Sequence, residues 1–329
     1  MRAVGIERFG GPQVLEVLDL PVPELRRGEV LVKVLFAGVN YIDVYMRRGD
    51  QGPSPGGLAM PRVLGREGAG EVVKTGAGVS NLTAGDRVAW CVTAGAYAEL
   101  CAVPAWRLWP VPADVPLDVA CALQLQGATA HFLATSTFPL RQNDVALVHS
   151  GAGGVGQLLI QLAKLCGARV LATVGDGAKA PVAASRGADA VVVRSTQDFL
   201  ETAMTATEGR GCHVVYDAIG RDTLEKSIAA CRRRGLVVLY GGASGAVEAL
   251  NPLALAEAGS IYFTRPHLAD FMQDAAEVQA RSSEMADLWR TGRLAVEIGR
   301  VLPLDGARAA HEALESRTLT SKILLRPVA

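Results

Sequence analysis

The first third of the chain shows hydrophobic residues that alternate with polar ones in short runs rich in β-branched side chains. This spacing is typical of strands with one buried face, and it predicts strands at 29–37, 70–74, 86–91 and 97–103. Gly and Pro separate the runs, most densely at 52–57. Many short strands divided by turn residues favour a β-rich, partly open barrel.

The middle of the chain has a different pattern, in which short apolar runs alternate with segments of helical spacing. The apolar runs predict strands at 145–149, 169–174, 190–193, 213–218, 236–240 and 260–264. The helical spacing predicts helices at 155–165, 178–186, 199–207 and 223–231. Buried strands that alternate with helices indicate a doubly wound parallel sheet.

The last part of the chain predicts one long amphipathic helix over 268–290, then a strand, a helix and a strand within 301–326. We expect this tail to rejoin the β-rich domain, so that the doubly wound domain is an insertion. The predicted organisation is therefore an α/β fold. Residues 1–122 and 266–329 form the β-rich domain and residues 123–265 form the doubly wound domain.

Composition supports two folded cores and limits the kinds of partner. Half of the 329 residues are hydrophobic, and Lys plus Arg equal Asp plus Glu at 33 each. This balance does not favour nucleic-acid binding. The N-terminus lacks a signal-peptide pattern, and no apolar run reaches the roughly 18 residues that a membrane helix needs. We therefore expect a soluble, cytoplasmic protein that binds no membrane. The six cysteines lack C-x-x-C spacing, so we expect reduced, buried thiols rather than a zinc lobe.

A glycine-rich turn follows the first strand of the doubly wound domain. Gly151, Gly153 and Gly156 form G-x-G-x-x-G, and the helix is expected to start near Gly154 and Val155. Such glycines allow the tight turn, the close approach of a pyrophosphate, and close packing of helix on strand. The pyrophosphate then meets free N–H groups at the helix N-terminus. An ordinary glycine-rich turn is the alternative, but the strands that follow favour a dinucleotide-binding, or Rossmann, domain.

The end of the second strand bears on the choice between NAD and NADP. NAD enzymes usually place an acid there, and Asp176 follows Gly175 at a suitable distance from the glycine turn. Because it lies beyond the apolar strand and between two glycines, we interpret Asp176 as a turn residue. Lys179 follows closely and Arg194 ends the third strand, and two such cations suit a 2′-phosphate. The sequence therefore favours NADPH, although solvated surface charge would be the usual role of both side chains.

Further candidates lie where other strands of this sheet end. Asp217 ends the fourth strand, where a carboxylate either contacts the ribose or caps the next helix. Small residues are expected to line the crevice after the fifth strand, and residues after the sixth strand are expected to contact the cofactor. These candidates are Gly241, Gly242, Ser244, Phe263, Thr264 and Arg265.

Several motifs, taken together, resemble the zinc-free, zeta-crystallin-like quinone oxidoreductases of the medium-chain dehydrogenase/reductase superfamily. The resemblance covers nearly the whole chain. Its motifs are Phe9–Leu15 (FGGPQVL), Val39–Tyr45 (VNYIDVY), Leu64–Gly70 (LGREGAG), Ala84–Val88 (AGDRV), Gly127–Ala130 (GATA), Val215–Asp217 (VYD), Thr264–Pro266 (TRP) and Ala313–Arg317 (ALESR), besides the glycine turn.

The resemblance implies a GroES-like β-rich catalytic domain with an inserted Rossmann doubly wound parallel sheet. It implies NADPH-dependent reduction of quinones and a homodimer. In such dimers the last Rossmann strand pairs with its copy, which fits an edge strand at 261–264.

The same resemblance indicates catalysis without a metal. Zinc alcohol dehydrogenases of this superfamily carry cysteine at the position of Asn40 and histidine at the position of Arg66. Neither Asn nor Arg replaces these zinc ligands. Because no Lewis acid then polarises the acceptor, we expect an electron-poor acceptor, a quinone or an activated alkene such as an enone.

The resemblance also implies individual site residues. Asn40 and Tyr45 line the substrate pocket beside the nicotinamide, while Thr129 and Arg317 contact the cofactor. The alternatives are that Asn40 caps a helix over 42–48, that Tyr45 packs, that Thr129 serves its own helix and that Arg317 is a surface residue.

The chain departs from its relatives at two positions. Arg194 stands where many relatives carry a tyrosine against the adenosine phosphate, and an arginine can still stack on adenine and pair with phosphate. Gln126 stands where some relatives carry a lysine, so the role of that lysine is open.

Two other functions remain as alternatives. A 2-alkenal or enoyl double-bond reductase would share the cofactor site and differ in the pocket. A cofactor-binding protein with little turnover, of a crystallin-like or RNA-binding kind, is a different class. The even charge balance and the aromatic content of 5% weigh against binding to nucleic acid.

Overall fold

The structure is a computed structural model that describes residues 1–50 and 60–327, so the Gly- and Pro-rich segment 52–57 lies outside the described residues. The chain divides into two compact units. Unit 1 combines Met1–Ala128 with Met272–Ala329, and unit 2 is Thr129–Phe271. One unit is thus inserted in the other, and each crossing lies six residues beyond the expected boundaries at 122 and 265.

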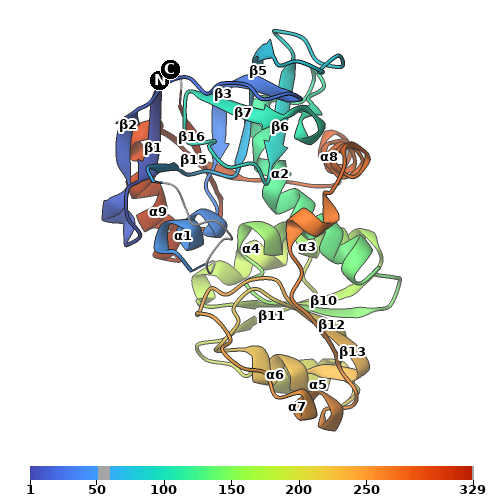
Figure 1. Cartoon of the computed structure of the whole chain (residues 1–329). Helices are drawn as coiled ribbons and strands as arrows, with labels where there is room; N and C mark the ends of the chain where they lie inside the picture. Colours follow the sequence, from blue (N-terminus) through green and yellow to red (C-terminus); the bar gives the residue numbers. More distant parts are fainter. Residues whose placement is uncertain (51–59, 328–329) are drawn as a thin grey trace. The chain divides into compact units, whose positions relative to one another are not determined.

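Unit 1 contains two sheets, and strands from both the N-terminal and the C-terminal part of the chain contribute to it (Figure 1). The smaller sheet has the order β2 (Glu16–Asp19), β1 (Arg2–Ile6), β4 (Arg62–Val63). The larger sheet has the order β15 (Ile298–Pro303), β16 (Lys322–Arg326), β3 (Glu29–Gly38), β5 (Glu67–Thr75), β6 (Arg87–Cys91), β8 (Trp109–Pro110), with β7 (Leu100–Pro104) on β3. Leu324 of β16 lies opposite Gly38 of β3 in an antiparallel pair, so the tail rejoins the β-rich unit as predicted.

The helices of unit 1 are α1 (Tyr41–Arg48), α8 (Ala275–Arg290) and α9 (Ala307–Glu315), with short 3-10 turns η1 (Pro12–Val14), η2 (Ala105–Arg107) and η6 (Leu304–Gly306). The unit boundary falls within α2 (Leu117–Phe132). The single helix predicted at 268–290 is wrong. A 3-10 turn, η5 (Leu268–Phe271), comes first, and α8 begins only after Asp274, whose carboxylate accepts a hydrogen bond from the Glu277 N–H (2.9 Å).

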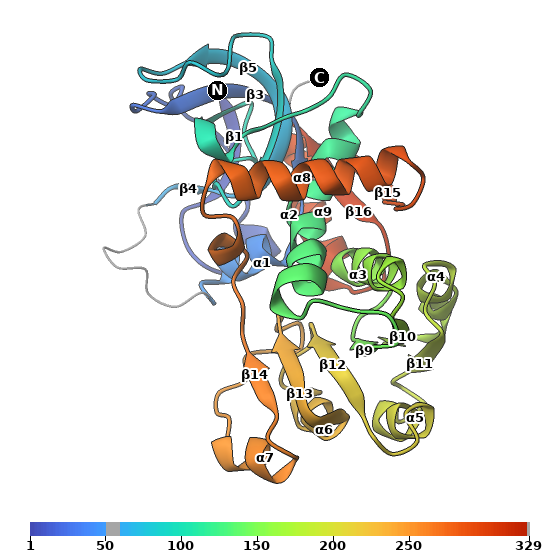
Figure 2. The same ribbon diagram turned by 90° about the vertical axis from the view of Figure 1, so that its right-hand side faces the viewer.

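Unit 2 is a doubly wound parallel sheet, which confirms the predicted fold class. Its strand order is β11 (Ala190–Val193), β10 (Arg169–Val174), β9 (Val145–Val148), β12 (Cys212–Asp217), β13 (Cys231–Leu239), β14 (Tyr262–Thr264), and every pairing is parallel. Helices α3 (Gly154–Leu165) and α4 (Ala180–Ser185) cover one face, and α5 (Phe199–Ala206) and α6 (Leu224–Ala229) cover the other (Figure 2). The remaining elements are η3 (Leu133–Thr137), a π-helical turn, η4 (Gly177–Lys179) and α7 (Pro252–Glu257).

The central strands of unit 2 are buried on both faces, which is why their sequences are continuous apolar runs. Leu147, Leu171, Val215 and Val237 from four adjacent strands are fully buried in one core. All six cysteines are free, and all but Cys166 are buried, as expected for reduced thiols. In the described ranges, no helix combines the length and apolarity that a membrane crossing would require.

Candidate functional site

The glycine turn of unit 2 has the geometry of a diphosphate cradle. Ser150 adopts a left-handed φ of 55°, and α3 begins at Gly154 with Gly153 as its N-cap. A Cβ on Gly156 would lie 2.2 Å from the Ser150 carbonyl oxygen, so the turn keeps this shape only with glycine there. The first amides of a helix have no carbonyl one turn earlier to bond, so they are available to an anion.

Two cations flank the turn that follows β10. The Arg194 N–H donates to the Val174 carbonyl (2.9 Å), and a Cβ on Gly175 would lie 3.7 Å from Arg194 Nη2. Lys179 ends η4 a few residues further on. Asp176 is a turn residue, as predicted, because its Oδ1 accepts the Ala178 N–H (2.9 Å). Two positive side chains, one in this turn and one at the end of β11, therefore lie by the turn, while its acid, Asp176, caps η4 locally.

The Asp217 carboxylate at the end of β12 is fully buried and bonded within its own turn. Its Oδ1 accepts the N–H groups of Ile219 (2.8 Å) and Gly220 (3.0 Å), and the hydroxyls of Thr223 and Ser227 also donate to the carboxylate. This geometry fits the alternative in which Asp217 caps the following turn. The hydrogen bonds that the carboxylate makes do not support the alternative in which it contacts the ribose.

A buried histidine directly before the glycine turn belongs to the same polar network. His149 Nε2 lies 3.1 Å from the Ser227 hydroxyl, and His149 Nδ1 lies 2.9 Å from the Thr173 hydroxyl. Burial lowers the pKa of His149 to about 4. The imidazole is therefore neutral at physiological pH. Its two hydrogen bonds connect the end of β9 to β10 and to α6 next to the glycine turn.

The other predicted cofactor residues of unit 2 lie at the same edge of its sheet. Parallel strands end at one edge, and Gly241, Gly242 and Ser244 follow β13 while Phe263 and Arg265 lie in or just after β14. The Ser244 hydroxyl already donates to the Ile219 carbonyl (2.8 Å). Arg265 is exposed, and Thr129, on α2, is half-buried. Unit 2 thus gathers the glycine turn and the residues that follow β13 and β14 at one edge, while Thr129 lies on α2.

Unit 1 contains a polar centre that we name the buried amide centre: Asn40, Glu67, Gln126 and Lys322. Asn40 is the N-cap of α1, so the expected capping role is present. Its Nδ2 donates to Glu67 Oε2 (2.8 Å), and its Oδ1 accepts from Lys322 Nζ (2.8 Å) and Gln126 Nε2 (3.2 Å). The carboxamide is thus held on both ends by neighbouring side chains.

Lys322 was not predicted, and no local signal could have found it. Its ammonium group lies 2.5 Å from Glu67 Oε2, although 255 residues separate the two in sequence. The side chains are 1% and 0% exposed. Their pairing depends on β16 lying beside β3 and β3 beside β5.

Asp43, on the first turn of α1, lies beside this centre. Its Oδ2 accepts the Asn40 N–H (2.9 Å) and the Tyr97 hydroxyl (3.2 Å). Across the chain as described, its Oδ1 is buried without a hydrogen-bond partner. Burial raises the pKa of Asp43 to about 7, against the opposing effect of the Asn40 N–H.

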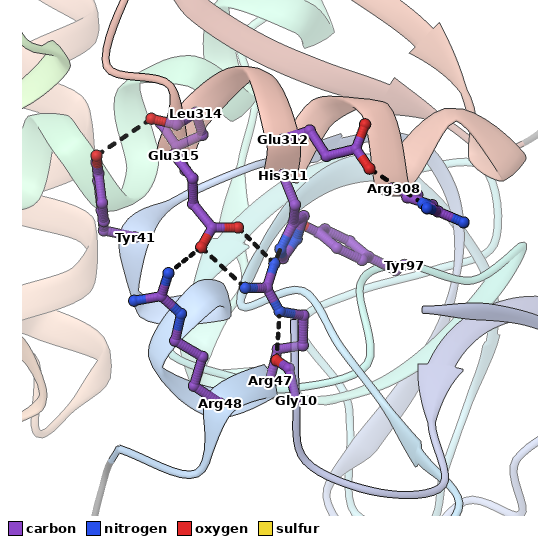
Figure 3. Close-up of polar contacts among 10 residues, drawn as sticks. All are labelled: Gly10, Tyr41, Arg47, Arg48, Tyr97, Arg308, His311, Glu312, Leu314 and Glu315. Carbon is purple, nitrogen blue, oxygen red and sulfur yellow. Dashed lines mark hydrogen bonds and ion pairs between the residues drawn. The ribbon is translucent and has the colours of Figure 1, made fainter. Parts of the chain in front are cut away.

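A second cluster joins α1 to α9, and Figure 3 shows its members turned toward one another. Arg47 is fully buried and forms two hydrogen bonds to Glu315 (2.7 and 3.0 Å), which also pairs with Arg48. Arg47 Nη1 also lies 3.1 Å from His311 Nδ1. An arginine only donates, so Nδ1 accepts, and the neutral imidazole presents its Nε2–H to the Tyr97 oxygen at 3.2 Å. Burial lowers the pKa of His311 to about 3, which agrees with this assignment.

This cluster fixes the two segments that carry the remaining predicted site residues. Tyr45 is half-buried on α1, with its ring centre 6.2 Å from that of Tyr41. The Tyr41 hydroxyl donates to the Leu314 carbonyl (3.1 Å) at the end of α9. Arg317, just beyond, is exposed with a left-handed φ of 56°. The structure thus places Asn40, Tyr45 and Arg317 in unit 1, and it places the other predicted site residues in unit 2.

The donor set of unit 1 does not suit a catalytic metal. Arg66 Nη2 donates to the Val92 carbonyl (2.5 Å), and Glu67 is neutralised by Lys322. Within the described residues, no three His, Cys, Asp or Glu side chains form a group that could hold a metal ion. Carboxamide and guanidinium groups do not replace the thiolate and imidazole ligands that zinc requires.

Known relatives match this chain over nearly its full length. A family model described as "Alcohol dehydrogenase GroES-like domain" matches residues 26–113, and one described as "Zinc-binding dehydrogenase" matches residues 154–280. Quinone oxidoreductase 1 of Escherichia coli (strain K12) is 36% identical over 98% of this chain and 99% of its own length. A 2-haloacrylate reductase of Burkholderia sp is 36% identical over 99% of both chains. A solved quinone oxidoreductase of Escherichia coli complexed with NADPH superposes with a TM-score of 0.95 at 36% identity, covering 99% of this chain and all of that one.

Proposed function

Because the chain belongs to the quinone oxidoreductase family of the medium-chain dehydrogenases/reductases, we propose that it reduces quinones with NADPH and without a metal. The observation that carries the proposal is the glycine turn, where a Cβ on Gly156 would meet the Ser150 carbonyl oxygen at 2.2 Å. Relatives titled as quinone oxidoreductases match over nearly the full length, and one has been solved with NADPH.

The chain's own residues divide the work as follows. Amides of the turn 151–156 hold the diphosphate, and Lys179 and Arg194 hold the 2′-phosphate. A bound reduced nicotinamide supplies the hydride. Tyr45 donates a hydrogen bond to the oxygen of the acceptor, and Asn40 lies at the substrate pocket with its carboxamide fixed by the buried amide centre.

The direct test is the oxidation of NADPH by the purified protein with quinones of increasing size. We expect turnover with a small quinone such as 1,4-benzoquinone, and slower turnover with NADH in place of NADPH. Nucleotide oxidation no faster than the uncatalysed background, with NADPH still bound, would support a binding protein instead.

Replacing Lys179 and Arg194 by alanine should weaken NADPH binding selectively. Each loses a charge-assisted contact to the 2′-phosphate, so the KM for NADPH should rise about 10- to 100-fold in the double variant. The KM for NADH should change less than about threefold, because NADH lacks that phosphate. Steady-state kinetics with both nucleotides measure this, and an equal rise for both would refute the phosphate assignment.

A second candidate function is the reduction of α,β-unsaturated carboxylates, and one residue favours it. Arg66 is half-buried, and burial lowers the pKa of its guanidinium. A guanidinium has five N–H donors. Within the described residues, the Arg66 side chain donates to the Val92 carbonyl through Nη2. An arginine with donors to spare binds a carboxylate in bidentate fashion. A relative titled 2-haloacrylate reductase makes such an acceptor the natural one to try.

Replacing Arg66 by methionine should separate the two candidates. With 2-chloroacrylate as acceptor, kcat/KM should fall about 10- to 100-fold, because a carboxylate loses a charged partner. With neutral 1,4-benzoquinone it should stay within about threefold. The variant Arg66→Lys keeps the charge and should retain part of the carboxylate activity. If wild-type protein does not reduce 2-chloroacrylate at all, the second candidate is withdrawn.

We also propose that the protein is a cytoplasmic homodimer formed through β14. This strand is an edge of the parallel sheet and pairs with β13 on one side. Its Tyr262 is 65% exposed, and Leu253 in α7, the helix that precedes β14 in the chain, is 60% exposed. An edge strand with exposed apolar side chains is suited to pair with a second copy.

Light scattering coupled to gel filtration should therefore give a mass of two chains. The variant Tyr262→Asp should shift the protein toward the single-chain mass, because it places like charges in a paired edge. Leu165→Asp is a matched control, since Leu165 is exposed on α3 away from that edge. A wild-type protein that elutes as a single chain would contradict the dimer.

A further inference from the structure

We propose that Lys322 is a positioning residue for the reduction: it neutralises Glu67 and fixes the orientation of the Asn40 carboxamide. The inference rests on the proposed function, in which Asn40 lies at the substrate pocket. It assigns a role to a residue at the far end of the chain, in β16, that no sequence motif had singled out.

The ion pair is built into the fold rather than formed on its surface. Lys322 and Glu67 are 1% and 0% exposed, and Glu67 Oε1 also accepts the Leu125 N–H (2.6 Å). A Cβ on Gly38 would lie 1.8 Å from Glu67 Oε2, so the carboxylate occupies space that only a glycine on β3 leaves open. A buried carboxylate is costly without a partner, and Lys322 supplies the opposite charge.

The ammonium group of Lys322 and the carboxylate of Glu67 together set which way the Asn40 amide points. Lys322 can only donate, so the oxygen of the amide must face it, and Gln126 Nε2 donates to the same oxygen. The Glu67 carboxylate only accepts, so the NH2 group must face it. Removing the ammonium group would remove one of the two charged partners that set the amide orientation and would leave the other, Glu67, without its counter-charge.

The charge of the centre bears directly on the chemistry. A neutral quinone that takes up a hydride becomes a hydroquinone monoanion, which then takes a proton from water, while the cofactor is oxidised. An unpaired negative charge on Glu67 would oppose the negative charge that develops on the acceptor. With Lys322 in place, the Glu67–Lys322 pair has no net charge.

The geometry also suggests a second substitution, at Gln126, that should compensate for the loss of Lys322. Gln126 Nε2 and Lys322 Nζ reach the same atom, Asn40 Oδ1, from two different elements, at 3.2 and 2.8 Å. A lysine at 126 would therefore bring an ammonium group to that oxygen from α2. This is the position whose role the sequence left open, and in this chain Lys322 brings a cation to the same oxygen from β16.

The experiment compares wild type with Lys322→Met and Gln126→Lys/Lys322→Met, using NADPH and 1,4-benzoquinone. For Lys322→Met we expect kcat to fall at least about tenfold, with the KM for NADPH changed less than about twofold. For the double variant we expect kcat to recover to within about threefold of wild type. Lys226→Met is the control, since Lys226 forms an exposed ion pair with Asp198 in unit 2 and should leave kcat unchanged.

The outcomes are distinguishable from failure of the proposed function. If the wild-type protein turns over no quinone or enone, the proposed function fails. If wild type is active and folded Lys322→Met has the same kcat, the role of Lys322 is overturned. If Lys322→Met does not fold, the double variant decides. A folded double variant with kcat below about a tenth of wild type overturns the role, and one near wild type supports it.

Discussion

Replacing Arg47 by methionine will lower the free energy of unfolding by about 3–5 kcal/mol. The guanidinium is fully buried, and it donates to Glu315, to His311 and, through Nε, to the Gly10 carbonyl (3.1 Å). Methionine preserves much of the length and removes every donor, so it leaves the carbonyl and the imidazole nitrogen of the cluster in Figure 3 without their partner. Equilibrium unfolding in urea measures the loss.

Arg48 provides the matched control, because it pairs with the same Glu315 carboxylate from the next position of α1. Its side chain is 48% exposed, so Arg48→Met should cost less than about 1 kcal/mol. Two variants with similar stability would show that Glu315 acts through surface charge alone, which would contradict the role of the buried cluster. Because the cluster holds α1 against α9, Arg47→Met should also raise the KM for quinone.

Replacing Gly156 by alanine should weaken NADPH binding about 100-fold or more, since displacements near 1 Å have effects of this size. The new Cβ would lie 2.2 Å from the Ser150 carbonyl oxygen and 2.9 Å from the Gly151 Cα, so the turn has to open. Opening it moves the amides that hold the diphosphate. Fluorescence titration of NADPH gives the dissociation constant, and thermal unfolding shows whether the variant is folded.

Gly177→Ala is the control for this prediction, because it lies in the neighbouring turn after β10. A Cβ there would have no heavy atom within 4 Å, so NADPH affinity should stay within about twofold of wild type. If both alanine variants bind NADPH like wild type, the glycine turn is not the diphosphate site.

The parallel sheet of unit 2 was predictable because its information is local. Each strand is a short apolar run, and predicted strands such as 169–174 and 190–193 coincide with β10 and β11. The prediction of one helix over 268–290 was wrong because an amphipathic pattern does not reveal an interruption of a few residues between two helical segments. Asp274 caps α8 there and ends the continuity of the pattern.

The sequence also identified candidate residues without deciding their roles. Asp217 was open between ribose contact and capping, and its buried hydrogen bonds within one turn fit capping. Asn40 was open between pocket and cap. It is the cap of α1, and its carboxamide is also held by Glu67 and Lys322.

By itself, the sequence determined the fold class, the glycine turn and the family resemblance, because each depends on residues close together along the chain. Only the tertiary structure decided the buried amide centre and the Arg47 cluster. Lys322 meets Glu67 across 255 residues, and Arg47 meets Glu315 across 268. Such pairs form only when strands and helices from the two ends of the chain pack together. Because a buried charge is costly without its partner, these pairs depend on the tertiary packing, and residue spacing along the chain does not reveal them.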